Sequence, residues 1–272
     1  MRTFNVNSNN AVISTSSNGN LMKWCIEENG KQIFIKSSSI DRQTLQLSWM
    51  YESYSEVICS KLFKELGIDN IVQYYLCEII IDNKIKTIGC YSYSFLKSYE
   101  HQVTIAHLIK TGKLSNYATL GYNGYTQCIE EIKALTNIDY KNEINKILTL
   151  DFLTLNQDRH LGNLGFIYNS KTGNIRIQDI FDNGDSLFST KRIEEMNYTT
   201  DLDGYIRSKP FIYSHYEQLK YTNFEYVKNL NFNIENTLIF IESLNNKGLN
   251  MNRIRFIEQL LITRINILKS FL

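Results

Sequence analysis

The chain has 272 residues, 43% of them hydrophobic, so it can bury one large core or two modest ones. Its 29 lysines and arginines balance 28 aspartates and glutamates, which gives no bulk electrostatic drive toward nucleic acid or an anionic membrane surface. The five cysteines form no zinc-binding pattern, and no apolar stretch approaches the roughly 20 residues that span a bilayer.

Strand patterns dominate the first hundred residues, with one helix between them. Residues 1–20, rich in Ser and Asn, are expected to form a loop or a mobile strand end. The apolar runs within 21–36 flank a glycine-containing turn and predict a β-hairpin. Residues 47–66 carry apolar side chains at helical spacing and stop at Gly67. The β-branched and aromatic runs within 74–96 predict a second pair of strands.

Beyond Lys97 the hydrophobic pattern changes to the period of helices. Apolar residues recur at three-and-four spacing in five segments, namely 104–109, 125–135, 141–155, 233–244 and 252–272. The order of elements predicts an α+β, bilobal protein. A small N-lobe of antiparallel sheet plus one helix is expected over residues 1–96, and a larger, mostly helical C-lobe over residues 97–272.

The most informative stretch runs over residues 148–187 and reads as helix, loop, hairpin and loop. Asp158 and Asn163 lie five residues apart in QDRHLGN, the spacing by which a kinase catalytic loop holds a base and a metal ligand. The following hairpin is expected to return Asp182, in FDNG, beside that loop. Carboxylate and amide oxygens suit Mg²⁺. The pattern predicts a kinase-like phosphotransferase, with Asp158 as base and with Asn163 and Asp182 as metal ligands.

Lys36, at the end of the strand QIFIK, is the candidate for pairing with the phosphates of ATP. A helix carboxylate is expected to hold it, and Glu56 is preferred over Glu52, one turn earlier. The alternative interpretation is an edge-strand lysine with ordinary surface glutamates.

The phosphate-covering loop is the weakest element, because the chain has no GxGxxG sequence. Ser17 and Gly19 belong to STSSNGN, whose backbone N–H groups could cradle phosphates or could equally be a polar tail. Its serines are candidate autophosphorylation sites. Ser94 and Phe95, where the lobes are expected to join, are the remaining candidate nucleotide contacts.

Taken together, NQDRHLGNLG, IFDNGDSL, the FIK strand end and YESYSEVICSKLFKELGI resemble the HipA-like serine/threonine kinases over most of the chain. The resemblance implies a kinase that uses ATP and Mg²⁺, in which the residues named above keep their roles. The DRHxxN string is also similar to the catalytic loop of phosphoinositide-type lipid kinases, which implies a catalytic role for His160. A loop histidine that bonds the backbone is the alternative.

The resemblance also implies a protein substrate with a Ser or Thr acceptor, and it leaves an antitoxin or a host protein open as a further partner. We expect a cytoplasmic location, while export without a cleavable signal peptide stays open, so the protein is either a toxin of a toxin–antitoxin system or a secreted effector. Two other functions are a kinase of lipids or small molecules and a nucleotide-binding pseudokinase. Residues 191–221, which contain Lys-Pro-Phe and several tyrosines, are expected to pack against the C-lobe or to form part of the acceptor groove.

Overall fold

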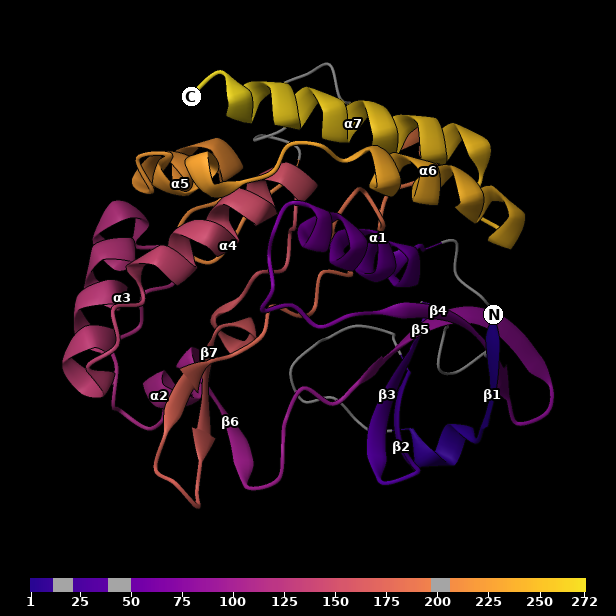
Figure 1. The fold of residues 1–272 in the computed structure, drawn as a ribbon, viewed down its shortest axis with the longest axis horizontal. Helices are drawn as coiled ribbons and strands as arrows, with labels where there is room; N and C mark the ends of the chain where they lie inside the picture. Colours follow the sequence, from indigo (N-terminus) through magenta and orange to yellow (C-terminus); the bar gives the residue numbers. More distant parts are fainter. Residues whose placement is uncertain (12–21, 39–49, 197–205) are drawn as a thin grey trace.

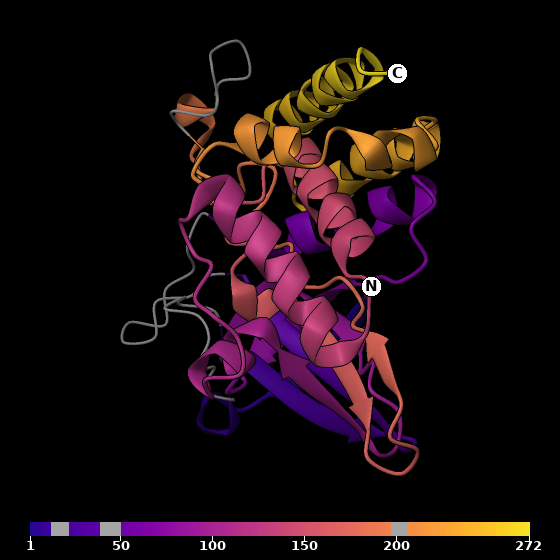
Figure 2. The ribbon, with the colours of Figure 1, turned by 90° about the vertical axis from the view of Figure 1, so that its left-hand side faces the viewer.

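The computed structural model describes residues 1–11, 22–38, 50–196 and 206–272. Most helices gather in the upper part of Figure 1 and two sheets lie below them, and the view from the side agrees (Figure 2). In the described part of the chain, no helix is both long and apolar enough to cross a bilayer.

The larger sheet contains the two predicted hairpins. Its strands are β1 (Arg2–Val6), β2 (Lys23–Glu28), β3 (Lys31–Ser37), β4 (Tyr75–Ile81) and β5 (Ile85–Tyr93). Their order is β1-β4-β5-β3-β2, and every neighbouring pair is antiparallel except β1 and β4. The predicted strand pairs are therefore confirmed. The expectation of a purely antiparallel sheet is corrected, because the β1–β4 pair is parallel.

The expectation of a loop at the start of the chain is wrong for β1. This strand pairs in parallel with β4, with Thr3 opposite Glu78. Phe4 is only 5% exposed and packs among the core residues of the sheet, which anchors the strand. Because the partner strand lies about 75 residues further along the chain, no local pattern signals the pairing.

The turn between β2 and β3 sets the register of the strands that face the site. Asn29 and Gly30 both have positive φ, 51° and 72°, as the two-residue hairpin turn that matches strand twist requires. The resulting register places Lys23 directly opposite Lys36. Both lysines therefore lie on one face of the hairpin, while Trp24 pairs with the core residue Ile35 on the other.

Helix α1 (Glu52–Glu65) lies between the sheet and the helices of the C-lobe. It packs against β4 and β5 on one side and against α6 (Glu235–Ser243) on the other. Nearly all of its residues are buried, including the polar ones. Residues 47–49 of the predicted helix lie outside the described residues. In the described part of the chain, the helix begins at Glu52.

In its described residues, the C-lobe contains the five predicted helices and one more. They are α2 (Ile105–Lys110), α3 (Gly121–Thr136), α4 (Lys141–Thr154), α5 (His215–Tyr221), α6 and α7 (Met251–Lys269). Short 3₁₀ turns are η1 (Ser8–Asn10), η2 (Leu161–Asn163), η3 (Ile193–Glu195), η5 (Glu225–Asn229) and η6 (Leu244–Lys247). Every residue of α4 from Glu143 onward is buried, so this helix forms the centre of the lobe. It gives the loop that follows Thr154 a rigid starting point.

The second sheet is small and supports the segment between the two predicted site loops. It contains β6 (Glu100–Thr104), β7 (Gly165–Asn169) and β8 (Ile175–Ile177), all antiparallel. The hairpin β7–β8 is the predicted one, whereas the polar strand β6 was not predicted. At Gly165 a Cβ atom would lie 2.3 Å from the carbonyl oxygen of Val103, so only glycine allows this approach. A lobe boundary between residues 96 and 97 stays a prediction.

Candidate active site

Asp158 is placed by the end of the central helix. Leu155 closes α4 in the left-handed conformation, with φ 54°, and turns the chain out of the helix. The buried Asn156 then accepts a hydrogen bond from the backbone N–H of Asp158, at 3.0 Å. The side chain of Asp158 remains 37% exposed, so its carboxylate is accessible at a rigidly held position.

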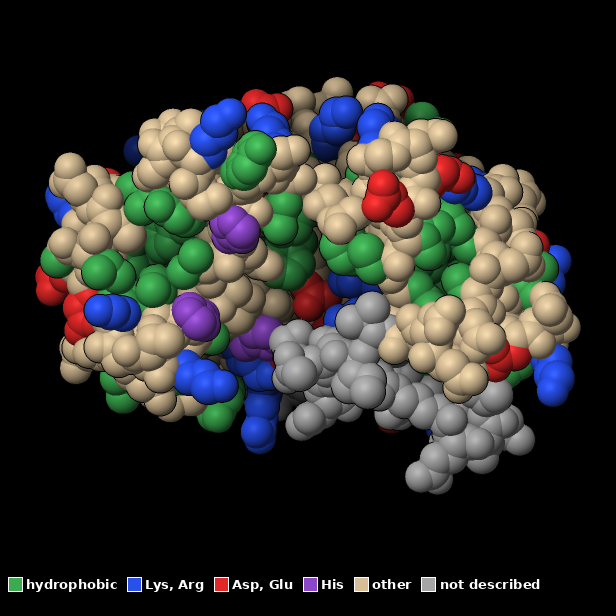
Figure 3. Space-filling model, turned by 90° about the horizontal axis from the view of Figure 1, so that it is seen from below, with side chains coloured by type: hydrophobic (Ala, Val, Ile, Leu, Met, Phe, Trp, Pro, Cys, Tyr) green, Lys and Arg blue, Asp and Glu red, His purple; other side chains and the backbone are tan. Residues whose placement is uncertain are grey.

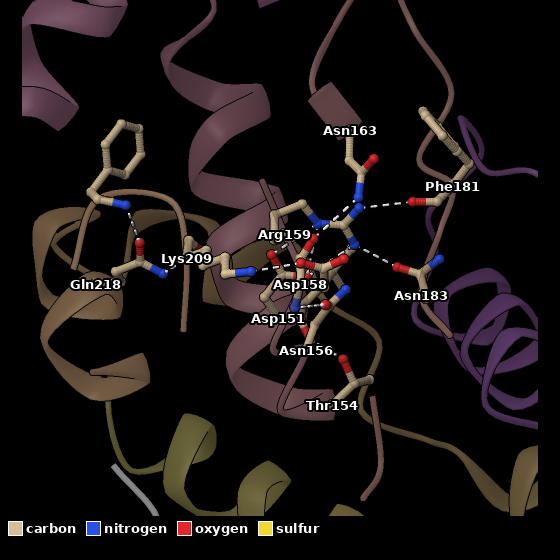
Figure 4. A network of polar contacts seen from close by, with 12 residues as sticks. Asp151, Thr154, Asn156, Asp158, Arg159, Asn163, Phe181, Asn183, Lys209 and Gln218 are labelled. Atoms are coloured by element: carbon tan, nitrogen blue, oxygen red, sulfur yellow. Dashed lines mark hydrogen bonds and ion pairs between the residues drawn. The ribbon is translucent and has the colours of Figure 1, made fainter. Parts of the chain in front are cut away.

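Two side chains face the carboxylate of Asp158. Lys209 Nζ lies 2.7 Å from Oδ1, as Figure 4 shows, and His160 Nε2 lies 3.9 Å from Oδ2. The other ring nitrogen of His160 accepts a hydrogen bond from the backbone of Gly162, at 3.1 Å. His160 therefore both bonds the backbone and faces Asp158. Lys209 was not among the predicted site residues.

Asn163 lies beside the same loop. Its amide nitrogen donates to the carbonyl oxygen of Asp158 at 3.2 Å, and Gln178 donates to the carbonyl oxygen of Asn163 at 2.6 Å. Figure 4 shows the amide oxygen of Asn163 directed away from Asp158. The side chain is thus oriented with its oxygen available to a ligand.

Lys36 joins two carboxylates from distant parts of the chain. Its Nζ lies 2.6 Å from Glu56 Oε1 on α1 and 2.7 Å from Asp182 Oδ1 on the loop after β8. Glu56 is thus the helix glutamate that contacts Lys36, whereas Glu52 lies against the backbone at Gly184. The second oxygen of Glu56 accepts the backbone N–H next to Asp182 at 2.8 Å, so one helix side chain holds both the lysine and the loop.

The charges in this cluster set one another's protonation. Burial raises the pKa of Asp182, but Lys36 and Lys23 outweigh it and hold that pKa well below its usual range. Burial lowers the pKa of Lys36, but Asp182 and Glu56 outweigh it and raise that pKa well above its ordinary value. Burial raises the pKa of Glu56, against the pull of Lys36. Asp182 and Lys36 therefore remain charged at neutral pH.

Arg159 ties the two loops to the central helix. Its guanidinium bonds both carboxylate oxygens of Asp151 on α4, and both side chains are 1% exposed. It also donates to the carbonyl oxygen of Phe181 at 2.8 Å and to Asn183 Oδ1 at 2.5 Å (Figure 4). These contacts flank Asp182 on both sides. Arg159 thus braces the loop that carries Asp182.

The oxygens of Asp182 and Asn163 fit a hard divalent cation by their chemistry. Within the described residues, no hydrogen-bond donor contacts Asp182 Oδ2 or Asn163 Oδ1, although the Asn163 side chain is nearly buried. A carboxylate and an amide oxygen are typical ligands of Mg²⁺, with waters or phosphates completing the shell. Asp182 also adopts the left-handed backbone conformation, with φ 59°, which aspartate tolerates better than most residues.

Lys23 is a further residue of the site that was not predicted. It lies opposite Lys36 in the β2–β3 register, so both side chains project from the same face. Burial and Lys36 lower its pKa, while Asp182 and Glu56 raise it in part. The signal was present in the sequence, because a two-residue Asn-Gly turn implies this register.

Two of the four remaining candidate nucleotide contacts, Ser94 and Phe95, lie in the described part of the chain. Ser94 donates its backbone N–H to Gln32 at 2.9 Å, and the ring of Phe95 stacks on that of Phe181, with centroids 5.7 Å apart. Phe95 thus contacts the residue that precedes Asp182. Ser17 and Gly19 lie outside the described residues.

Seen from below, the molecule is hollowed between its two halves (Figure 3). Acidic and basic side chains lie at the centre of this face, and hydrophobic side chains lie on both sides of them. The distribution agrees with the charged cluster built above.

No protein-family model and no curated protein matches the chain. Among solved structures, the Helicobacter pylori proinflammatory kinase CtkA has a TM-score of 0.70 at 18% identity, over 91% of this chain and 93% of that one. HipA from the Shewanella oneidensis toxin–antitoxin system has a TM-score of 0.54 at 11% identity, over 95% of this chain and 65% of that one. Hydra Fam20 has a TM-score of 0.52 at 9% identity, over 97% and 84%. The chain therefore has the predicted bilobal kinase fold of the HipA-like and Fam20-like kinases.

Proposed function

We propose that this protein is an ATP-dependent serine/threonine protein kinase. The observation that carries the proposal is the convergence of one strand, one helix and two loops. Lys36 pairs with Glu56 and Asp182, and Arg159 bonds the loop of Asp182 to the loop that holds Asp158 and Asn163. Phosphoryl transfer consists largely of positioning the reactants and neutralising phosphate charge, and this set supplies both.

The nucleotide side of the reaction involves Lys36, Asn163 and Asp182. Lys36 would bind the phosphates of ATP, held in place by Glu56. Asn163 and Asp182 would hold Mg²⁺, which supplies charge neutralisation at the phosphates when bound. Arg159 keeps Asp182 in position through the backbone and side-chain atoms on either side of it.

Asp158 serves the acceptor. The acceptor hydroxyl oxygen forms a bond to the γ-phosphorus, the bond from that phosphorus to the ADP oxygen breaks, and the hydroxyl proton passes to the carboxylate of Asp158. Lys209 on Oδ1 orients this carboxylate and leaves Oδ2, on the His160 side, to meet the hydroxyl. His160 would act as a second catalytic group through Nε2.

The choice of a protein acceptor is supported by the resemblance of the sequence motifs and by the descriptions of the neighbours. CtkA is described as a proinflammatory kinase, and HipA belongs to a toxin–antitoxin system. We propose that the protein acts as a toxin or an exported effector and that it autophosphorylates in the serine-rich sequence around Ser17.

The test is label transfer from radiolabelled ATP with Mg²⁺ to the protein itself and to a generic protein acceptor. Asp158→Asn should lower transfer about 10²- to 10⁴-fold, the usual contribution of a general base, with Mg-ADP affinity unchanged. Asp182→Asn should lower both transfer and Mg-ADP affinity. The exposed Asp69→Asn is the matched control and should behave as wild type.

Undiminished transfer by Asp158→Asn would refute the assignment of the base. Label on phosphoinositide vesicles but on no protein would favour the lipid kinase. Tight Mg-ATP binding without transfer to any acceptor would favour the pseudokinase.

A further inference from the structure

A pocket of about 460 Å³ opens beside Asp158 on the C-lobe. It lies between α2, the residues that precede α3, the catalytic loop and residues 209–213. Its apolar lining comes from five side chains: Ala106, Ala118, Leu161, Pro210 and Tyr213. His160 and Lys209 are its ionisable lining residues. The two side chains that face Asp158 thus also belong to the pocket.

One wall of the pocket is preformed by hydrogen bonds. The carbonyl oxygen of Pro210 accepts the backbone N–H of Thr119, just before α3, at 3.0 Å, and that of Phe211 accepts the N–H of Gly121, the first residue of α3, at 2.9 Å. Gln218 on α5 donates to the carbonyl oxygen of Lys209 and accepts from the N–H of Phe211, both at 2.9 Å (Figure 4). The wall is therefore ordered before a ligand binds, and binding loses little conformational entropy there.

The lining selects the chemistry of the occupant. Apolar surface predominates, and the described residues that line the pocket include no carboxylate to pair with a basic side chain. A sugar ring would need several fixed polar partners, but in this lining Thr119 donates to the carbonyl oxygen of Ala118, and His160 and Lys209 face Asp158. Ala106, Thr119, Lys209 and Tyr213 are exposed, so the pocket is open enough for a chain to pass along it.

The position of the pocket limits where the acceptor hydroxyl can be. Lys209 lines the pocket and reaches Asp158 with the same side chain, so the two sites are separated by about one side-chain length. An extended chain advances about 3.3–3.6 Å per residue. A side chain in the pocket and a hydroxyl at Asp158 therefore belong to residues one or two positions apart.

We propose that this pocket is the specificity site for the acceptor polypeptide and that it takes an aliphatic or aromatic side chain within two residues of the phosphorylated Ser or Thr. The inference rests on the proposed protein kinase function. Burial of one such side chain should favour apolar-flanked substrates by about tenfold or more over acidic ones.

The probe is a set of decapeptides around one serine, in which each of the two positions on either side is fixed in turn as leucine, phenylalanine, aspartate or lysine. Binding is measured by fluorescence anisotropy with Mg-ADP present, and transfer is measured with radiolabelled ATP. Ala106→Trp fills the pocket from an exposed position on α2. Ala134→Trp, at an exposed position on α3 away from the pocket, is the matched control.

Wild type and Ala134→Trp should prefer leucine or phenylalanine at one of the four positions, and Ala106→Trp should lose that preference while keeping its affinity for Mg-ADP. An absence of apolar preference in binding and transfer, or its persistence in Ala106→Trp, would overturn the proposal. If apolar peptides bind in an Ala106-dependent manner but are never labelled, the pocket stands and the kinase function fails.

Discussion

At the scale of single residues, the site is defined by charges that the fold brings together out of water. The pair Arg159–Asp151 is fully buried, and removing one partner of such a pair usually costs about 3–5 kcal/mol because the other charge is left unpaired. Lys23 and Lys36 present the opposite situation. They are like charges directly opposite one another on a hairpin; Glu56 and Asp182 pair with Lys36, whereas no carboxylate among the described residues forms an ion pair with Lys23.

We therefore expect Lys23 to bind the nucleotide phosphates together with Lys36. Lys23→Gln should weaken Mg-ADP binding about tenfold and leave adenosine binding unchanged, because only the phosphates meet the lysine. Isothermal titration calorimetry with both ligands measures this. Lys31→Gln, at the exposed far end of the same hairpin, is the control. Equal losses for adenosine and Mg-ADP would show that Lys23 supports the strand and not the phosphates.

At the scale of elements, α5 links the pocket beside Asp158 to the core. Gln218 on this short helix holds the pocket wall, and His215 at its start is 1% exposed. Neither ring nitrogen of His215 has a hydrogen-bond partner among the described residues. Burial, helped by Arg264, lowers the pKa of His215 to about 3, so the imidazole is neutral in the folded protein.

The buried histidine predicts a loss of stability in acid. Below the ordinary pKa of about 6.5, the unfolded chain binds a proton at His215 and the folded chain does not, so stability falls by about 1.4 kcal/mol per pH unit. Urea unfolding at pH 7.5 and pH 5 measures this loss. His215→Leu should lose about 2 kcal/mol less than wild type between these pH values, and the exposed His107→Leu should match wild type. Identical pH dependence in all three proteins would contradict the prediction.

At the scale of the whole molecule, the two lobes are joined through the site itself. Lys36 and Glu56 come from the sheet and α1, and they bond Asp182 and the backbone of Asn183 in the C-lobe. Tyr51 adds a backbone bond to Ser189 at 3.0 Å, and Glu65 accepts bonds from the start of α6. A ligand bound at these contacts should therefore stabilise both lobes together.

Mg-ADP should raise the free energy of unfolding of the whole chain. At a ligand concentration 100 times the Kd, the gain is about 2.7 kcal/mol, or roughly 5–10 °C in Tm. Differential scanning calorimetry should show one transition that moves as a unit. EDTA, or the variant Asp182→Asn, should remove most of the shift, since both remove the metal that links ADP to the protein. A shift that EDTA leaves intact would contradict the role given to Asp182 and Asn163.

The parts of this protein that depend on neighbours along the chain could be predicted from local sequence patterns. The β2–β3 hairpin follows from its Asn-Gly turn, the helices follow from their apolar period, and the spacing of Asp158, Asn163 and Asp182 follows from a loop, a hairpin and a second loop. The bilobal fold was predictable because each of these local preferences agrees with the global arrangement.

Only the tertiary structure determined the contacts between segments that are far apart in sequence. Lys209 reaches Asp158 across 51 residues, β1 pairs with a distant strand, and the pocket beside Asp158 combines α2, residues 160–162 and residues 209–213. Such contacts leave no periodic signal, because they depend on how whole elements pack and not on the conformation of any one of them.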